Sequence, residues 1–160
     1  MIVNRCILRI ALSLLVVFVL CACNNTYFTS YADLPEGKWD SRDTLVFEVP
    51  GDPINDTRVV KKTLAARVRY TNAYKYRKVS LGVDFCSEDG KVIKKDTLTF
   101  ELFDKNGGRN GNGTVYLESE EKSFDVEMTP SSSNVLRVYH LMRLDPLEGI
   151  SNVVISLYDK

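Results

Sequence analysis

The fold class of this chain is decided by residues 78–103, KVSLGVDFCSEDGKVIKKDTLTFELF. Apolar residues stand at every second position before the turn SEDGK and again after it: Val79, Leu81, Val83, Phe85, Leu98, Phe100 and Leu102. Successive side chains of a strand point to opposite faces, so this alternation gives each segment one apolar face. The stretch therefore predicts two antiparallel strands joined by a short turn that contains glycine.

Similar alternation continues on both sides of this hairpin, and no segment shows a sustained helical stripe. The other expected strands are residues 44–50, 63–71, 114–118, 123–129, 134–142 and 150–158. About eight short strands without intervening helices predict an all-β fold, an antiparallel β-sandwich of jelly-roll type. We expect one such domain over residues 44–160.

The first residues have the composition of a secretory signal. Arg5 and Arg9 are the only charges before an uncharged, almost wholly apolar run from Ile10 to Ala22. A membrane-spanning helix needs about 20 apolar residues, and this run is shorter. A basic start, a short apolar run and a small residue before the cleavage site predict a signal peptide over residues 1–22. An uncleaved signal anchor is the alternative.

Two cysteines close this run, in the stretch LCACNN. Leu20 stands three positions before Cys23 and Ala22 directly before it, whereas the bulky Leu20 directly precedes Cys21. Only Cys23 thus resembles the cysteine of a bacterial lipobox, whose thiol receives a diacylglycerol before the signal is cleaved. Two or more acyl chains anchor a protein stably. We expect a lipid on Cys23, which attaches the chain to the membrane, and a tether over residues 23–43.

The residue after Cys23 and the charge of the mature chain bear on its location and partners. Asn24 is not the acidic residue that resembles an inner-membrane retention signal, so we expect the outer membrane, with the domain facing the periplasm. Removal of residues 1–22 takes two of the 21 basic residues and none of the 21 acidic ones, which leaves 19 and 21. A slightly acidic chain has no electrostatic attraction for nucleic acid, and none is expected as a partner.

The reactive side chains predict no active site. His140 is the only histidine, and it is in step with Leu136 and Val138, so we expect a structural histidine on the core side, with its hydrogen bonds satisfied, in preference to a functional one. Cys86 follows Phe85, so we expect it to point to the face opposite the core residues of that strand. It lies in DFCSED, where acidic neighbours disfavour the thiolate, so an inert or partly exposed cysteine is expected. Alternation places Asp125 and Glu127 on an outward face, where solvated carboxylates are expected.

The loop DKNGGRNGNG, residues 104–113, only superficially resembles a calcium loop. Arg109 stands where an EF-hand requires glycine, and Val115 stands in place of the closing glutamate. Its glycines and asparagines are also typical of a long hairpin loop, which is the favoured interpretation. We therefore expect no metal, no cofactor and no catalytic residues, and a chain that is not an enzyme.

Two stretches are candidates for partner binding. In YTNAYKYRK, residues 70–78, Tyr70, Tyr74 and Tyr76 alternate with basic residues, an arrangement that can stack on sugars or hold an anionic partner. The alternative is a solvated edge strand. In MRLDPLEG, residues 142–149, Arg143 and Asp145 lie in a connection stiffened by proline. The alternative there is a hairpin that only sets strand register.

Several stretches in order resemble the GldH family of gliding motility lipoproteins. They are the lipobox, LPEGKWDSRDTLVFEVP, DGKVIKKDTLTFEL and HLMRLDPLEGISNVVISL, with the densest match at Met142, Arg143, Leu147, Gly149 and Ile150. The resemblance implies a non-enzymatic accessory lipoprotein, a membrane-anchored scaffold or stabilising subunit of the gliding machinery and its coupled protein secretion. Other envelope lipoproteins and motility or secretion components are the implied partners. A periplasmic carbohydrate- or peptidoglycan-binding lipoprotein is the alternative.

Overall fold

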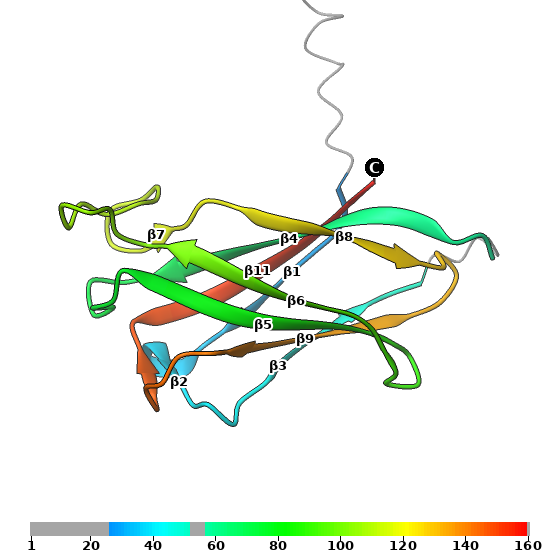
Figure 1. The fold of residues 1–160 in the computed structure, drawn as a ribbon, viewed down its shortest axis with the longest axis horizontal. Coiled ribbons are helices and arrows are strands. Elements are labelled where there is room, and N and C mark those ends of the chain that lie inside the picture. Colours follow the sequence, from blue (N-terminus) through cyan, green and yellow to red (C-terminus); the bar gives the residue numbers. More distant parts are fainter. Residues whose placement is uncertain (1–25, 52–56, 160) are drawn as a thin grey trace, which may run out of the picture.

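The structure is a computed structural model that describes residues 26–51 and 57–159. These residues form an all-β sandwich of two antiparallel sheets, which confirms the predicted fold class (Figure 1). The predicted signal peptide and Cys23 lie outside the described residues. Within the described ranges, no helix has the length and hydropathy needed to cross a membrane.

The first sheet has the order β1-β11-β4, and both β7 and β8 pair with β4. Its strands are β1 (Thr26–Asp33), β4 (Val60–Tyr70), β7 (Leu117–Glu118), β8 (Lys122–Met128) and β11 (Ile150–Asp159). Leu64 and Val68 of β4 and Val153 and Ile155 of β11 point inward and are fully buried. The opposite, outer face of this sheet carries polar and charged side chains.

The second sheet has the order β3-β9-β5-β6. Its strands are β3 (Leu45–Val49), β5 (Lys78–Ser87), β6 (Val92–Glu101) and β9 (Asn134–His140). The predicted β5–β6 hairpin is confirmed: Leu81 pairs with Leu98, and Gly90 has a φ of 83° in the turn. On the outer face, the ring of Tyr139 covers Gly82, where a Cβ atom would lie 2.4 Å from the ring.

A small third element closes one end of the sandwich. The 3-10 helix η1 (Pro35–Gly37) leads into β2 (Lys38–Trp39), which pairs with β10 (Leu147–Glu148). Trp39 is fully buried, and its indole nitrogen donates a hydrogen bond to the carbonyl of Asp43 at 2.8 Å. The segment around Trp39 is therefore part of the folded domain.

The structure differs from the sequence analysis in the segment assigned to a tether, residues 23–43. Its described part forms β1, η1 and β2, and β1 pairs with β11 from Thr26↔Tyr158 to Asp33↔Asn152. The alternation in β1 is weak because an edge strand buries its inward side chains only in part, as at Phe28 and Ala32. The strand expected over residues 114–118 is also shorter, since only Leu117–Glu118 pairs with β4.

The antiparallel connections define two ends of the sandwich (Figure 1). The terminal end is where β1 begins and β11 finishes, and it also holds the turns at 87–91 and 129–133. The groove end holds η1, β2 and β10, together with the 71–77 turn and the 102–116 loop. Strand β1 runs from the terminal end to the groove end.

Candidate functional site

A groove of about 870 Å³ opens at the groove end, over the outer face of the first sheet. Four parts of the chain line it: residues 33–38, residues 69–73 at the end of β4, residues 112–118 and residues 148–152 at the start of β11. Tyr116 is a large aromatic residue, yet it is 60% exposed. The groove therefore brings together segments that are far apart in the sequence.

The charges that line this groove do not balance. The carboxylates are Asp33, Glu36, Glu118 and Glu148, and the basic side chains are Lys38 and Arg69. Lys38 Nζ lies 3.0 Å from Glu36 Oε2, and Arg69 Nε lies 3.0 Å from Glu118 Oε2. The hydrogen bond between Lys38 and Glu36 lowers the pKa of Glu36 and raises the pKa of Lys38. Asp33 and Glu148 form no ion pair within 4 Å among the described residues, although the charge of Glu148 attracts Lys38, its register partner in the β10–β2 pairing. The lining as a whole carries four carboxylates and two basic groups.

Asn152 is a buried amide in this lining, with an exposed fraction of 5%. Its Nδ2 donates to Asp33 Oδ1 at 3.0 Å, whereas its Oδ1 has no hydrogen-bond partner in the described chain. Oδ1 is covered by the surrounding chain, and Arg69 of β4 is the register partner of Asn152. A buried acceptor without a donor costs about 1–3 kcal/mol.

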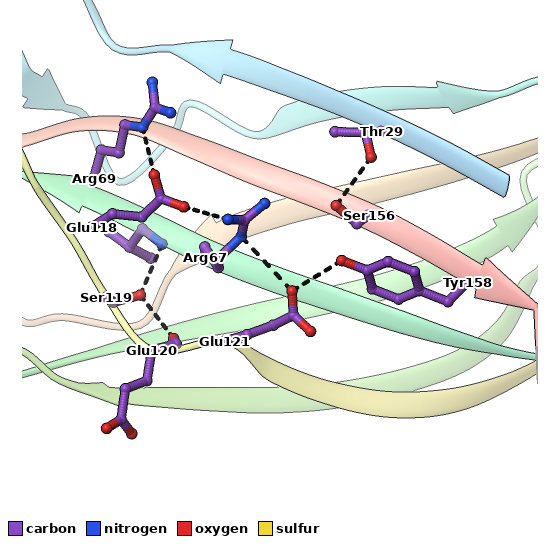
Figure 2. Close-up of polar contacts among 10 residues, drawn as sticks. Thr29, Arg67, Arg69, Glu118, Ser119, Glu120, Glu121, Ser156 and Tyr158 are labelled. Carbon is purple, nitrogen blue, oxygen red and sulfur yellow. Dashed lines mark hydrogen bonds and ion pairs between the residues drawn. The ribbon is translucent and has the colours of Figure 1, made fainter. Parts of the chain in front are cut away.

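An ion-pair network borders the groove on the outer face of the first sheet (Figure 2). Glu118 lies between Arg67 and Arg69 and pairs with both guanidinium groups. Arg67 Nε lies 3.7 Å from Glu121 Oε2, and the Tyr158 hydroxyl donates to the same oxygen at 3.1 Å. These acidic side chains are therefore held as ion-pair partners of arginine.

The structure separates the three tyrosines that the sequence suggested for binding. Tyr70 and Tyr74 are buried, and burial raises the pKa of both hydroxyls. The hydroxyl of Tyr70 shares its one proton between the carbonyls of Leu102 and Asn110, at 2.9 and 2.6 Å, and Tyr74 donates to the carbonyl of Lys78 at 2.7 Å. Neither ring can stack on a ligand in solvent.

Tyr76 and the 142–149 connection remain at the surface. Tyr76 is 40% exposed, and Arg143 is exposed with no hydrogen bond or ion pair to any described residue. Asp145 accepts two hydrogen bonds from Ser41, from its backbone nitrogen at 2.9 Å and its hydroxyl at 2.6 Å. These bonds, the side-chain one first, lower the pKa of Asp145. The carboxylate thus ties the 141–146 segment to the loop after β2.

The two predicted binding stretches lie side by side at the groove end. The amide of Thr71 donates to the carbonyl of Gly149 at 2.9 Å, which joins the 71–77 turn to the start of β11.

Sequence reasoning missed Asp33, Glu148 and Asn152 as site residues. Asp33 and Asn152 are brought together by the pairing of β1 with β11. The sequence does not predict this pairing, because residues 23–43 resemble a tether and not a strand.

His140 lies on the core side, as predicted. It is 5% exposed, and its ring packs edge-on against Trp39, with 5.4 Å between the ring centroids. The expectation that its hydrogen bonds are satisfied is wrong, because neither ring nitrogen has a partner among the described residues.

Of the two expectations for Cys86, inert or partly exposed, the structure contradicts the exposure. Cys86 is fully buried, although it lies on the face of β5 opposite Phe85. The pairing of β5 with β9 continues without a shift through these two residues, and the extra residue at the β5–β6 irregularity is Ile93. Its sulfur lies 3.7 Å from the carbonyl of Asp84.

The glycine-rich loop is organised by its own aspartate. Asp104 Oδ1 accepts hydrogen bonds from the amides of Asn106 and Gly108 at 2.7 and 2.8 Å. Residues 26–51 and 57–159 contain no cluster of three histidine, cysteine or acidic side chains that could hold a metal ion.

Fold and site together define a small β-sandwich protein with an open, acidic groove at one end. Residues 26–157 match the family model described as GldH lipoprotein. The chain belongs to the GldH lipoprotein family, which confirms the resemblance noted in the sequence. This is a family of envelope lipoproteins of the gliding-motility type, associated with the membrane through a lipid, and it is not a known enzyme family.

Solved structures with a similar β-rich architecture share little sequence with this chain. The Yersinia pseudotuberculosis-derived mitogen is 9% identical, with a TM-score of 0.40, over 86% of this chain and 88% of that one. A family 35 carbohydrate-binding module from Cellvibrio japonicus is 13% identical, with a TM-score of 0.38, over 88% and 94% of the two chains. No curated protein matches in sequence. These partial likenesses assign no ligand to this chain.

Proposed function

We propose that this protein is a non-enzymatic scaffold or stabilising subunit, held at the outer membrane by a lipid on Cys23 and facing the periplasm. It would serve the envelope machinery of gliding and the protein secretion coupled to it. Membership of the GldH lipoprotein family and the stretch LCACNN, Leu20 to Asn25, support the anchor.

The observation that carries this proposal is the start of β1 at Thr26, three residues after Cys23. Three residues of extended chain span at most about 10 Å. A lipid on Cys23 would therefore hold the terminal end of the sandwich close to the bilayer surface. Eight residues of strand extend about 26 Å. The groove end would then project away from the membrane, where a partner can reach it.

The state of the reactive side chains supports a role without catalysis. His140 and Cys86 are buried, and acidic side chains on the outer face of the first sheet are paired with arginine. A nucleophile or general base must reach its substrate. The described residues of the groove instead offer charged and polar surface, which is suited to holding a partner.

The carbohydrate- or peptidoglycan-binding alternative depended on stacking by Tyr70, Tyr74 and Tyr76. Because Tyr70 and Tyr74 are buried, their rings cannot form the exposed aromatic surface that this alternative requires, and the alternative is not favoured.

The anchor is tested with Cys23→Ala in intact cells. We expect globomycin-sensitive processing and palmitate labelling of the natural chain, and loss of both, with release from the membrane fraction, in the variant. Cys86→Ser, which changes the other cysteine of the mature chain, should keep both. Membrane attachment and labelling that survive Cys23→Ala would contradict the proposal.

The scaffold role is tested by deletion and complementation. We expect deletion to impair motility or secretion, and the natural chain to restore it while Cys23→Ala does not. Unchanged motility and secretion after deletion, together with no envelope protein captured by cross-linking, would overturn the role.

A further inference from the structure

We propose that the groove binds a lysine or arginine side chain, presented by an exposed segment of the protein partner that this chain holds. The inference rests on the proposed scaffold function and deepens it, because it names the chemistry by which the partner is recognised.

The first argument is the charge of the lining. Two ion pairs, Lys38–Glu36 and Arg69–Glu118, use both basic side chains that line the groove. Asp33 and Glu148 remain without an ion pair in the described part of the chain. A cation that enters the groove meets four carboxylates and only two basic side chains, so a basic group is favoured over an acidic one.

The second argument is independent of charge and concerns Asn152. Its Oδ1 is a buried acceptor that lacks a donor, and its Nδ2 is already committed to Asp33. Oδ1 has almost no accessible surface, so a ligand reaches it only when the side chain of Asn152 turns toward the groove. A ligand that donates hydrogen bonds then removes this deficit, whereas one that only accepts them cannot. Ammonium and guanidinium groups carry three and five donors and no acceptor, so they match this lining in both charge and hydrogen bonding.

The third argument is the shape and place of the groove. A volume of about 870 Å³ accommodates a long side chain together with the backbone that presents it. Tyr116 lines the groove with a ring that is 60% exposed, and an aromatic face near a bound cation adds a favourable cation–π contact. The groove also lies at the end of β1 opposite Thr26, away from the proposed anchor.

The test is an NMR titration of the full lipidated chain, labelled with ¹⁵N and held in detergent micelles. The probes are N-acetyl-arginine amide and N-acetyl-lysine amide, and N-acetyl-glutamate amide is the matched acidic probe. We expect the basic probes to shift the amide signals of residues 33–38 and 148–152, and the acidic probe to leave them in place.

Variants connect the shifts to the groove. Asp33→Asn and Glu148→Gln should each weaken binding of the basic probes about two- to fivefold, the range of a partly exposed ion pair. Glu127→Gln removes an exposed carboxylate of β8, which pairs with Lys61 outside the groove, and should leave binding unchanged. Glu148 is exposed and forms no ion pair with a described residue, so its variant tests the inference even if Asp33→Asn disturbs folding.

No shift with the basic probes, equal shifts with the acidic probe, or equal weakening by Glu127→Gln would each overturn the inference. If cross-linking in cells still captured an envelope partner, the scaffold function would stand without this mode of recognition. If no partner were captured and deletion had no effect, the scaffold function itself would fall.

Discussion

The backbone of Gly149 packs directly against the backbone of Tyr74. A Cβ atom at Gly149 would lie 2.2 Å from the nitrogen of Tyr74, and the φ of Gly149 is 89°, in the left-handed region. This contact joins the start of β11 to the 71–77 turn and holds two parts of the groove end together.

Gly149→Ala should therefore destabilise the domain by about 2–5 kcal/mol, since it adds both backbone strain and a steric clash. The control is Gly107→Ala, which also has a positive φ, 82°, but no atom within 4 Å of the added Cβ. That variant should lose only about 1–2 kcal/mol. Urea unfolding of the full chain measures both, and equal losses would contradict the packing described.

Tyr70→Phe should cost about 1–3 kcal/mol of stability, because two carbonyls lose the donor that Tyr70 supplies. Tyr76→Phe, at a side chain that is 40% exposed, should change stability by less than about 0.5 kcal/mol. Thermal unfolding distinguishes the two variants. A larger loss at Tyr76 than at Tyr70 would show that their assigned environments are wrong.

His140→Leu should raise stability by about 1 kcal/mol, since it removes two buried nitrogens without hydrogen-bond partners among the described residues. His140→Asn keeps a polar group at this site and should lower stability. Both are measured by urea unfolding. A clear loss of stability in His140→Leu would mean that the histidine is satisfied in the folded protein.

Asp145→Asn should lower the melting temperature at pH 7, and the difference from the natural chain should depend on pH. The hydrogen bonds from Ser41 place the pKa of Asp145 in the folded state below its unfolded value of about 4. The stabilisation is therefore complete above about pH 5 and is lost as the pH falls through the folded pKa.

Melting curves of both proteins between pH 2 and pH 7 test this sign. The difference between them should be constant from pH 5 to 7 and should shrink below pH 4. A difference that widens on acidification would contradict the hydrogen bonds assigned to Asp145.

The sequence predicts the hairpin well because its alternation is strong and its turn contains Gly90, which supplies the positive φ. It does not reveal β1, whose half-buried edge position leaves a weak pattern between Thr26 and Asp33. It also does not reveal the burial of Cys86, which is fully buried although it lies on the face of β5 opposite Phe85.

The groove could not be predicted for a related reason. Asp33, Glu148 and Asn152 come from segments whose proximity depends on the β1–β11 and β2–β10 pairings. The tyrosines of the 70–78 stretch were the more visible signal, yet aromatic residues serve cores as readily as binding surfaces. Only the burial of each ring distinguishes a core tyrosine from a binding tyrosine, and burial depends on the folded structure.

The central claim, that the groove end of a lipid-anchored sandwich holds an envelope partner, is tested most directly by site-specific photo-cross-linking in intact cells. A photoreactive residue is placed at Tyr116, beside the groove, or at Ile93 on β6, toward the terminal end. We predict a defined envelope-protein adduct from Tyr116, reduced by the double variant Asp33→Asn, Glu148→Gln and lost with Cys23→Ala. The absence of an adduct from Tyr116, or the same adduct in equal yield from Ile93, would contradict it.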